Sequence, residues 1–313
     1  MARALVFPGQ GSQAVGMGVA LAEASAAARE VFEEVDEAIS QPLFRLMKEG
    51  PEGDLVLTEN AQPALMAVSM AVMRVMEREG GFDLVRSARY VAGHSLGEYS
   101  ALAAAGSIGL SDTARLLKLR GKAMQRAVPV GQGGMAALLG LSLEDAAAVA
   151  EAAAQGDVCR AANDNAEGQV VVSGSSAAID RAVEIAKEMG AKKAMRLQVS
   201  APFHCPLMQP AADEMAEALG DVTISAPKVP LIANVTASAV DDPERIRALL
   251  VQQVTSMVRW RESVLYMRDN GIGELAEIGS GKVLATMTRR IDRSVSARAV
   301  NTPDDIEAFL GTL

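Results

Sequence analysis

The pattern of hydrophobic positions at the start of the chain predicts a strand followed by a helix. Residues 3–7, RALVF, are typical of a short buried strand, residues 8–16 form a glycine-rich loop, and an amphipathic pattern continues to about Ile39. A strand that leads through glycines into a helix is a common opening of α/β folds.

The same alternation continues over the next ninety residues. Thr58 is the expected N-cap of a long helix, and Ser111 is the expected cap of a later one. Gly80, Gly81 and Gly106 stand where helices should end, because glycine adopts the left-handed conformation at little cost. The predicted elements are helices over residues 60–79, 96–105 and 112–127 and a buried strand over 90–92.

The spacing of the predicted elements changes near residue 130 and predicts a separate small subdomain. Residues 128–134, VPVGQGG, are typical of a linker, and a compact alternation of elements follows. The order β-α-β-β-α-β is that of the ferredoxin-like unit, so we expect a small inserted subdomain at 130–198. Its predicted elements are strands over 135–140, 158–162, 169–173 and 193–199 and helices over 142–155 and 177–189.

Residues 199–313 return to the larger domain. Here the pattern predicts helices over 206–219 and 243–254, a strand over 231–233, and a last strand over 273–278 with helices on either side. We therefore expect residues 1–129 and 199–313 to form one α/β domain with a parallel sheet.

Composition narrows the class of protein. A formal charge of −9 argues against a general nucleic-acid surface, which needs clustered Lys and Arg. No window approaches the ~20 apolar residues of a membrane span, and the N-terminal MARALVFPGQGSQ lacks the apolar core of a signal peptide, so we expect a cytoplasmic protein. Two cysteines and two histidines are too few for a disulfide framework, or for a metal site built from cysteine or histidine, so no metal is expected. Nothing reads as a coiled-coil seam, and we expect a monomer.

Residues 93–97, GHSLG, match the G-x-S-x-G pattern of a nucleophile elbow. The match lies where the pattern requires it, between the predicted strand ending at Ala92 and the predicted helix beginning at Leu96. A helix N-terminus beside Ser95 would favour the oxyanion that forms when a thioester is attacked. The alternative is a chance glycine–serine turn, which the strand and helix context disfavours.

His204 is the candidate base for Ser95. His94 adjoins the serine, and its side chain should project away from it, which leaves His204 as the base if the serine has one. His204 lies in the loop APFHCP between a strand and a helix, where catalytic residues gather, although a lone histidine is often structural. Cys205 has no feature that marks it as more than a small buried residue.

Arg120 is an anomaly on its helix. Placed on a helical wheel, it falls on the apolar arc among Leu116, Leu117 and Met124, whereas the other basic residues of that helix, Arg115, Lys118, Lys122 and Arg126, share a polar face. A buried guanidinium must be paired. The wheel alone leaves two partners open, a structural Asp or Glu or the carboxylate of a substrate.

The loop PGQGSQ at 8–13 follows the first strand and should reach the sheet edge that carries the elbow. Glycines on both sides of Gln10 leave its N–H free to point inward, although a plain turn would have the same sequence. It lacks the G-x-x-x-x-G-K-[ST] pattern of a phosphate loop.

Taken together, five ordered motifs resemble the malonyl-CoA:acyl-carrier-protein transacylase family, and the resemblance covers nearly the whole chain. The motifs are FPGQGSQ at 7–13, GHSLGEYSAL at 93–102, LRGKAM at 119–124, PFHCPLM at 202–208 and GSGKVL at 279–284. The resemblance implies a hydrolase-like α/β core with a ferredoxin-like insertion. One departure is Ser280, where the family usually has proline, and we expect a looser turn there.

The resemblance also implies roles for individual residues. Ser95 would be the acylated nucleophile and His204 the general acid and base, with the backbone N–H groups of Gln10 and Leu96 holding the oxyanion. Arg120 would bind the malonyl carboxylate. The backbone carbonyl of Gln253 would orient His204, and Phe203 resembles the residue of malonyl-type rather than methylmalonyl-type acyltransferases.

The implied partners are malonyl-CoA and acyl carrier protein, with coenzyme A thioester as substrate and no cofactor. Because carrier proteins are acidic, docking would need a local basic surface. Two candidates are the face Arg115, Lys118, Lys122 and Arg126 and the cluster Lys187, Lys192, Lys193 and Arg196, although each is also typical of a solvated helix face. A discrete chain favours fatty-acid over polyketide synthesis.

Two other functions are still possible at this point. A serine thioesterase or hydrolase would use the same elbow, but its usual chain order places an acid between the serine and the histidine, and no distinctive acid stands there. It would not need Arg120. A docking module that has lost its chemistry is the non-enzymatic alternative, and the intact set of Ser95, His204 and Arg120 disfavours it.

Overall fold

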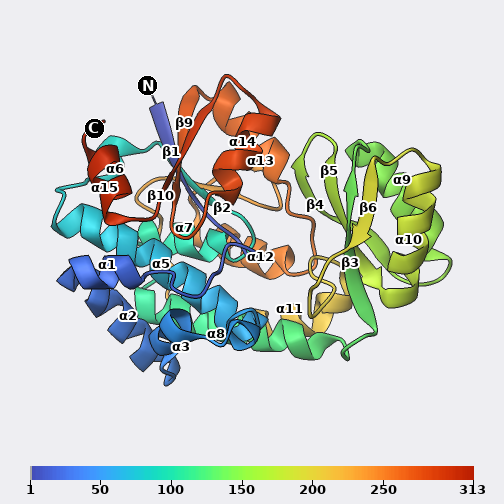
Figure 1. Ribbon diagram of the computed structural model, residues 1–313, viewed down its shortest axis with the longest axis horizontal. Coiled ribbons are helices and arrows are strands. Elements are labelled where there is room, and N and C mark those ends of the chain that lie inside the picture. The colour runs from blue at the N-terminus through green and yellow to red at the C-terminus, as the bar shows by residue number, and fades with distance from the viewer. Residues whose placement is uncertain (1) are drawn as a thin grey trace.

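Two β-sheets organise the chain, which a computed structural model describes over residues 2–313. The larger sheet has the strand order β10-β9-β1-β2-β7-β8, and all of its pairings are parallel except that of β7 with β8. Its strands are β1 (Ala2–Phe7), β2 (Tyr90–Gly93), β7 (Leu231–Ala233), β8 (Ser238–Val240), β9 (Ile272–Ile278) and β10 (Ser296–Val300). Figure 1 shows this sheet in the larger of two lobes.

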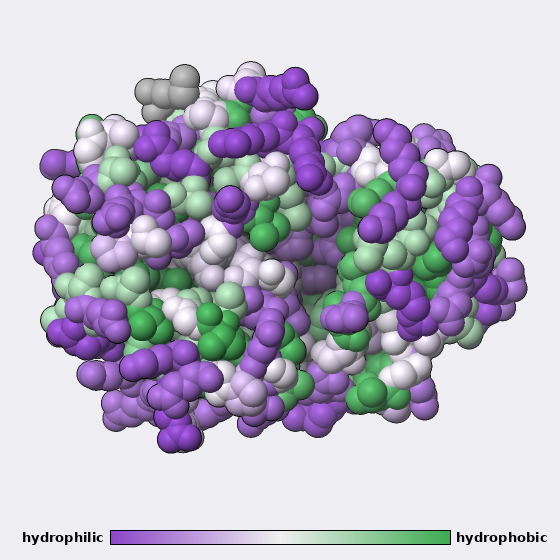
Figure 2. Space-filling model, viewed as in Figure 1, coloured by the Kyte–Doolittle hydropathy of each residue, from purple (hydrophilic) through white to green (hydrophobic). Residues whose placement is uncertain are grey.

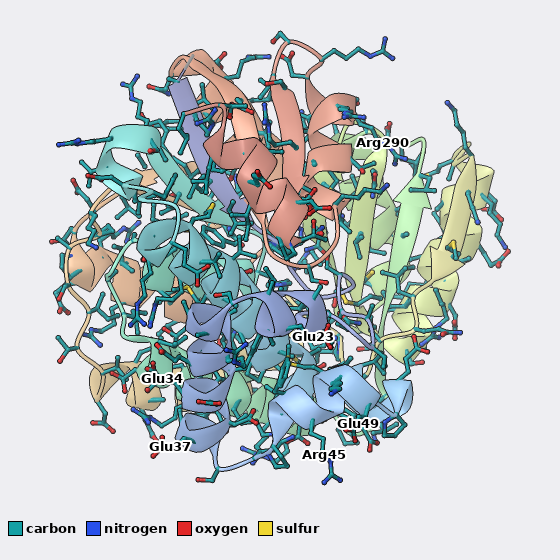
Figure 3. All side chains as sticks on the ribbon, turned by 60° about the vertical axis from the view of Figure 1, so that its left-hand side comes forward. Glu23, Glu34, Glu37, Arg45, Glu49 and Arg290 are labelled. Atoms are coloured by element: carbon teal, nitrogen blue, oxygen red, sulfur yellow. The ribbon has the colours of Figure 1, made fainter. Side chains whose placement is uncertain are left out.

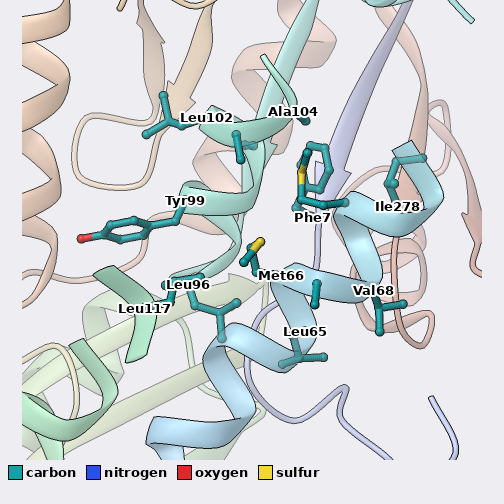
Figure 4. Close-up of a cluster of buried hydrophobic side chains, with 14 of the residues drawn as sticks. Phe7, Leu65, Met66, Val68, Leu96, Tyr99, Leu102, Ala104, Leu117 and Ile278 are labelled. Carbon is teal, nitrogen blue, oxygen red and sulfur yellow. The ribbon is translucent and has the colours of Figure 1, made fainter. Parts of the chain in front are cut away.

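Helices cover both faces of the larger sheet. Alternate residues of β1 point to opposite sides, so Leu5 and Phe7 enter one core and Ala4 and Val6 enter another. The first core is built largely from α2, α5, α7 and α8, and Figure 4 shows part of it, where Phe7 and Tyr99 lie among aliphatic side chains. The second core takes Trp260 and its neighbours from α13 and α14. Burial on both faces explains why the buried residues of β1, 4–7, and those of β2 carry no charged side chain.

The helices of this lobe precede and follow the small subdomain. Before it come α1 (Val19–Ala24), α2 (Ala26–Ile39), α3 (Leu43–Glu49), α4 (Glu52–Leu55), α5 (Thr58–Arg78), α6 (Leu84–Ser87), α7 (Gly97–Ala104) and α8 (Leu110–Ala127). After it come the 3-10 helix η1 (Pro206–Met208) and then α11 (Gln209–Gly220), α12 (Pro243–Gln253), α13 (Trp260–Asp269), α14 (Val283–Ile291) and α15 (Pro303–Leu310).

The second sheet forms the smaller lobe and has the order β4-β5-β3-β6 with antiparallel pairings throughout. Its elements are β3 (Gly133–Leu139), α9 (Leu143–Ala154), β4 (Cys159–Ala166), β5 (Gln169–Ser175), α10 (Ser176–Glu188) and β6 (Lys193–Arg196). The predicted β-α-β-β-α-β order is therefore confirmed, and α9 and α10 share one apolar core against the sheet. The bounds 130–198 for the subdomain, and 1–129 with 199–313 for the larger domain, stay a proposal.

Several predicted element boundaries were wrong. The amphipathic stretch before Ile39 is two helices, because Ser25 ends α1 and caps α2 through the Ala28 N–H. Thr58 lies inside α5 and Ser111 inside α8, and neither caps its helix. Residues 273–278 are not the last strand, since β10 follows and pairs in parallel with β9.

Charged side chains lie mainly on the outside of this framework. Figure 3 shows Glu23, Glu37 and Glu49 projecting from α1, α2 and α3 away from the core. Across residues 2–313, no helix is both long enough and apolar enough to span a membrane.

Candidate active site

The turn between β2 and α7 holds Ser95 in a strained conformation. Ser95 has a φ of 52°, in the left-handed region that serine rarely adopts. The side chain of Asn234 fixes this turn, because its Oδ1 accepts from the Ser95 N–H at 2.8 Å and its Nδ2 donates to the Gly93 carbonyl at 2.7 Å. The nucleophile elbow expected from GHSLG is therefore present in the backbone geometry.

Two glycines allow the strand and the helix to approach closely. A Cβ added to Gly93 would lie 1.9 Å from the carbonyl of Gly97, and one added to Gly97 would lie 2.2 Å from the carbonyl oxygen of Phe7. No side chain fits at either position without moving α7 away from the sheet. The spacing of G-x-S-x-G thus follows from steric contact on both sides of the serine.

His204 lies within hydrogen-bonding distance of the serine. Ser95 Oγ is 2.8 Å from His204 Nε2, and His204 Nδ1 is 2.9 Å from the main-chain carbonyl of Gln253. A carbonyl can only accept, so Nδ1 carries the proton and Nε2 is free to accept from the Ser95 hydroxyl. The family resemblance implied that Ser95, His204 and the Gln253 carbonyl share one site, and in the structure these groups lie together.

Burial keeps His204 uncharged. Loss of hydration is the largest cause that lowers its pKa to about 3, and the positive charge of Arg120 lowers it further. The imidazole is therefore neutral at physiological pH and can accept a proton from Ser95. No carboxylate hydrogen-bonds to His204 within residues 2–313, where the usual hydrolase triad has one.

Arg120 reaches the same hydroxyl from α8. Its side chain is 1 % exposed, and Nη2 donates to Ser95 Oγ at 3.1 Å and to Gln253 Oε1 at 2.8 Å, while Nη1 donates to Gln62 Oε1 at 2.8 Å. Among residues 2–313, no Asp or Glu lies within ion-pairing distance of Arg120. Of the two partners left open by the helical wheel, the structural salt bridge is thus not found in the described chain.

Glu98 was missed by the sequence analysis. It lies one turn beyond Ser95 in α7 and is 1 % exposed, and its Oε2 accepts from Gln253 Nε2 at 2.6 Å. Burial raises the pKa of Glu98 to about 7, against the opposing effects of its hydrogen bonds and of Arg120. A carboxylate on a helix that is buried on every side is unusual, and the absence of an apolar-polar periodicity in GEYSALAA is the sequence signal that could have identified it.

Asn234 and Gln62 were also missed. Asn234 directly follows β7, at the same end of the sheet as the elbow, so its position after a predicted strand was the available signal. Gln62 carries no such signal, because it lies in the first turns of α5 and meets Arg120 only through helix packing.

A cavity of about 750 Å³ opens above these groups between the two lobes. Figure 2 shows the surface hollowed at this place. Ser95, His204, Arg120 and Phe203 line it from the larger lobe, and a second set comes from the smaller lobe, namely Met135, Asn163, Asn165 and Val171. Phe203 is 9 % exposed, so its ring lies almost entirely within the wall.

The predicted oxyanion donors lie on the rim of the same cavity. Gln10 and Leu96 both line it, and the main-chain N–H of neither makes a hydrogen bond to another group of residues 2–313. Leu96 is the N-cap of α7, so its N–H belongs to the free donors of a helix N-terminus. Two unpaired N–H groups beside a nucleophile are the donors that an oxyanion requires.

The loop that carries Gln10 is held from two sides. The Gln10 side chain donates to Thr58 Oγ1 at 3.3 Å, and the same oxygen lies 3.1 Å from Ser200 Oγ, so Thr58 makes these contacts in place of the predicted cap. The Ser280 hydroxyl donates to the Ser12 carbonyl at 2.7 Å and is buried. The Ser280 hydroxyl thus ties its turn to the Gln10 loop, and the expectation that this turn is looser than one with proline stays a prediction.

The second histidine and the cysteine beside His204 make other contacts. His94 Nε2 lies 2.9 Å from Asn165 Oδ1, so its ring points to the smaller lobe rather than to Ser95. The Cys205 thiol donates to the Pro202 carbonyl at 3.2 Å, and burial raises its pKa, which disfavours the thiolate. No group of three or more His, Cys, Asp or Glu side chains in residues 2–313 is arranged to hold a metal ion.

The two candidate basic surfaces are largely paired with acids. On α8, Arg115 pairs with Asp112, Lys118 with Glu59 and Arg126 with Glu214. In the smaller lobe, Lys187 pairs with Glu184 and Arg196 with Asp180. The members of each set that make no ion pair in the described chain are Lys122 on α8, Lys192 before β6 and Lys193 at the start of β6.

Comparisons with known proteins agree with this geometry. Residues 4–303 match the family model of the acyl transferase domain. The malonyl CoA-acyl carrier protein transacylase of Escherichia coli (strain K12) is 44% identical over 307 residues, which cover 98% of this chain and 98% of that protein.

Solved structures give the same result. An acyl-carrier-protein S-malonyltransferase from Bartonella henselae is 56% identical with a TM-score of 0.98, and the match covers 100% of this chain and 99% of that one. A malonyl-transacylase solved in complex with a type II PKS acyl-carrier protein is 42% identical with a TM-score of 0.96 and full coverage of both chains. A serine elbow, a neutral histidine and full-length similarity to these proteins together show that the chain belongs to the acyl transferase family, and within it to the malonyl CoA-acyl carrier protein transacylases.

Proposed function

We propose that the protein transfers the malonyl group from malonyl-CoA to the phosphopantetheine thiol of acyl carrier protein, through a malonyl ester on Ser95. One observation carries the proposal. The Ser95 hydroxyl lies 2.8 Å from a neutral imidazole and 3.1 Å from a buried guanidinium that has no acidic partner in residues 2–313. The first group activates a nucleophile, and the second is suited to an acyl group that carries a carboxylate.

In the first half-reaction Ser95 Oγ attacks the thioester carbonyl of malonyl-CoA. His204 Nε2 takes the hydroxyl proton, and the tetrahedral oxyanion accepts hydrogen bonds from the main-chain N–H groups of Gln10 and Leu96. The carbon–sulfur bond then breaks, and the proton passes from His204 to the sulfur, which releases coenzyme A as the thiol. The Gln253 carbonyl stabilises the imidazolium through Nδ1.

The second half-reaction runs the same steps with the carrier thiol. His204 removes the proton of the phosphopantetheine thiol, and the sulfur attacks the ester carbonyl. The bond between Ser95 Oγ and the carbonyl carbon then breaks, and His204 returns the proton to Oγ. The reaction exchanges one thioester for another through an oxygen ester, so no atom changes its oxidation state and no cofactor is part of the proposal.

Arg120 is the proposed source of specificity for a carboxylated acyl group. Its neutral partners, Gln62, Gln253 and Ser95, solvate the guanidinium without neutralising it. A malonyl carboxylate would supply the missing counter-charge, whereas an acetyl group would leave the charge unpaired in a buried site. Phe203 is proposed to limit the space beside the acyl chain, since its ring forms part of the cavity wall.

The carrier protein is proposed to dock on a local basic surface. The favoured contacts are Lys122 on α8, or Lys192 and Lys193 at the start of β6, because they make no ion pair with acids of the described chain. We place the reaction in the cytoplasm, in agreement with two cysteines that are both free and buried, and we assign it to fatty-acid elongation.

The thioesterase alternative is less well supported. Hydrolysis needs no group that pairs with an acyl carboxylate, yet Arg120 is buried beside the nucleophile. The usual third member of a hydrolase triad is replaced by the Gln253 carbonyl. The polyketide alternative would use the same chemistry and differs only in the carrier protein.

The proposal is tested by recording the intact mass of the protein after incubation with malonyl-CoA. A malonyl adduct on the wild type but not on Ser95→Ala, discharged by holo acyl carrier protein, is the expected result. Release of free malonate faster than transfer to the carrier would replace the proposal with a thioesterase. If the malonyl group passed neither to water nor to the carrier thiol, only the non-enzymatic alternative, a docking module, would remain.

A further inference from the structure

A buried chain of hydrogen bonds connects Arg120 to Glu98 through one amide. Arg120 Nη2 donates to Gln253 Oε1 at 2.8 Å, and Gln253 Nε2 donates to Glu98 Oε2 at 2.6 Å. Gln253 is 0 % exposed, Glu98 and Arg120 are each 1 % exposed, and neither charged residue makes a direct ion pair within residues 2–313. The amide oxygen of Gln253 faces the cation, and its nitrogen donates both to the Glu98 carboxylate and to the Ser95 main-chain carbonyl, the latter at 3.0 Å.

This arrangement makes Glu98 the nearest available counter-charge for Arg120 in the free enzyme. The titratable groups around Glu98 are Arg120 from α8 and Tyr99 from α7 itself, while α12 and the segment after β7 present the amides of Gln253 and Asn234. His204 joins the same network through the Gln253 carbonyl. Of these groups, only Arg120 carries a positive charge at neutral pH, because His204 is neutral.

A malonyl carboxylate at Arg120 would change this balance. One guanidinium would then face two carboxylates in a site with little water, and like charges that share a buried site cannot both stay ionised. The substrate carboxylate contacts the cation directly, whereas Glu98 acts through an amide, so Glu98 is the group that gives up its charge. This step rests on the proposed function, because it assumes that the malonyl carboxylate pairs with Arg120.

We propose that Glu98 is a positioning residue that balances the charge of Arg120 through Gln253, and that formation of the malonyl-enzyme is coupled to uptake of a proton by the Glu98 carboxylate. The covalent step itself is balanced without this proton. The Ser95 Oγ–carbon bond forms, the carbon–sulfur bond breaks, and the hydroxyl proton leaves on the coenzyme A thiol. The proton taken up by Glu98 comes from solvent and adds to that balance.

The free enzyme supports the direction of this coupling. Burial raises the pKa of Glu98 to about 7, and Arg120 is one of the groups that oppose the rise. When Arg120 is neutralised by another carboxylate, this opposition weakens and the pKa of Glu98 rises further. Between about pH 7 and the raised pKa, Glu98 is therefore ionised before acylation and protonated after it.

The test mixes stoichiometric enzyme and malonyl-CoA at pH 7.5 in weak buffer with a pH indicator, and the adduct is counted by intact mass in the same sample. The number of protons taken up is divided by the number of malonyl adducts in the same sample. We expect roughly half a proton per adduct on the wild type and none on Glu98→Gln. Partial ionisation of the released thiol is the same in both proteins and cancels in the comparison.

A second variant shows whether the loss of proton uptake could come from a folding defect in Glu98→Gln. Methionine is similar in shape to glutamate and cannot ionise, so Glu98→Met should also form the adduct without proton uptake. Its far-UV circular dichroism spectrum and its thermal unfolding transition should match those of the wild type. Equal proton uptake by the wild type and by a folded variant that forms the adduct would overturn the inference and leave the proposed function intact. Absence of any adduct on the wild type would instead overturn the proposed function, and this inference with it.

Discussion

The Arg120 guanidinium donates a hydrogen bond of 3.1 Å to the hydroxyl oxygen of Ser95. A fixed cation beside a nucleophilic oxygen has two effects. It stabilises negative charge that develops on Ser95, and it disfavours a second positive charge on His204, whose pKa it helps to lower. Substrate recognition and the protonation state of the base are therefore linked through one side chain.

Replacing Arg120 by alanine should change the choice of acyl group. We expect the kcat/KM for malonyl-CoA to fall by about 100-fold or more, because the buried carboxylate would lose a charge-assisted partner, while that for acetyl-CoA falls much less. Initial rates with both thioesters measure the ratio. An Arg120→Ala variant that lowered both rates equally would show that Arg120 acts on Ser95 or on the fold and does not select the malonyl group.

The acid limb of the pH profile should lie well below the usual range of a histidine. The pKa of His204 is lowered to about 3, so the base stays neutral and acylation should not decline as pH falls through 6.5. The kcat/KM for malonyl-CoA between pH 4.5 and 8 tests this expectation. A midpoint near 6.5 would contradict it.

The charge of Arg120 can be separated from the burial of His204 in the same experiment. Arg120→Ala removes a positive charge that lowers the pKa of His204, so its acid limb should move toward neutral pH. Arg120→Lys keeps a charge near the site and should leave the limb closer to that of the wild type. Identical limbs in the two variants would assign the whole shift to burial.

The lowered pKa of His204 also determines how the free energy of unfolding changes with pH. In the unfolded chain His204 has an ordinary pKa of about 6.5, and in the fold it binds a proton only near pH 3. Between these values the unfolded state holds more protons, so the free energy of unfolding should fall as pH is lowered from about 6.5 toward 3. Urea unfolding at pH 7 and pH 5 measures this, with His204→Gln showing a smaller decrease.

Local patterns predicted much of this site, whereas long-range partners were not predictable. GHSLG, the polar outlier Arg120 and the single remaining histidine are visible in short windows, because strand, helix and turn chemistry are local. Glu98 and Gln62 act through contacts that α7 and α5 acquire only when the helices pack. The strand β10 was missed because SARAV carries Arg298 in the middle of a five-residue run, which hides its alternation.

Asn234 should prove essential to the elbow. Asn234→Ala leaves the Ser95 N–H and the Gly93 carbonyl without buried partners, which should lower the free energy of unfolding by about 2–4 kcal/mol and slow acylation. Asn234→Asp can still accept from Ser95 but cannot donate to Gly93, so it should lose part of this stability. Urea unfolding and the rate of adduct formation, compared in both variants, would refute this view if Asn234→Ala behaved as wild type.

The close approach of α7 to β1 gives the sharpest steric prediction. In Gly97→Ala the added Cβ would lie 2.2 Å from the Phe7 carbonyl oxygen, so the helix must move away from the sheet and carry Ser95 with it. We expect a loss of about 3 kcal/mol or more in the free energy of unfolding, with acylation lost even in the folded fraction. Gly220→Ala is the matched control, because a Cβ there meets no atom within 4 Å and should change stability by less than about 1 kcal/mol. If Gly97→Ala were as stable and as active as Gly220→Ala, the G-x-S-x-G spacing would owe nothing to contact between the helix and the strand, and the strain at Ser95 would need another cause.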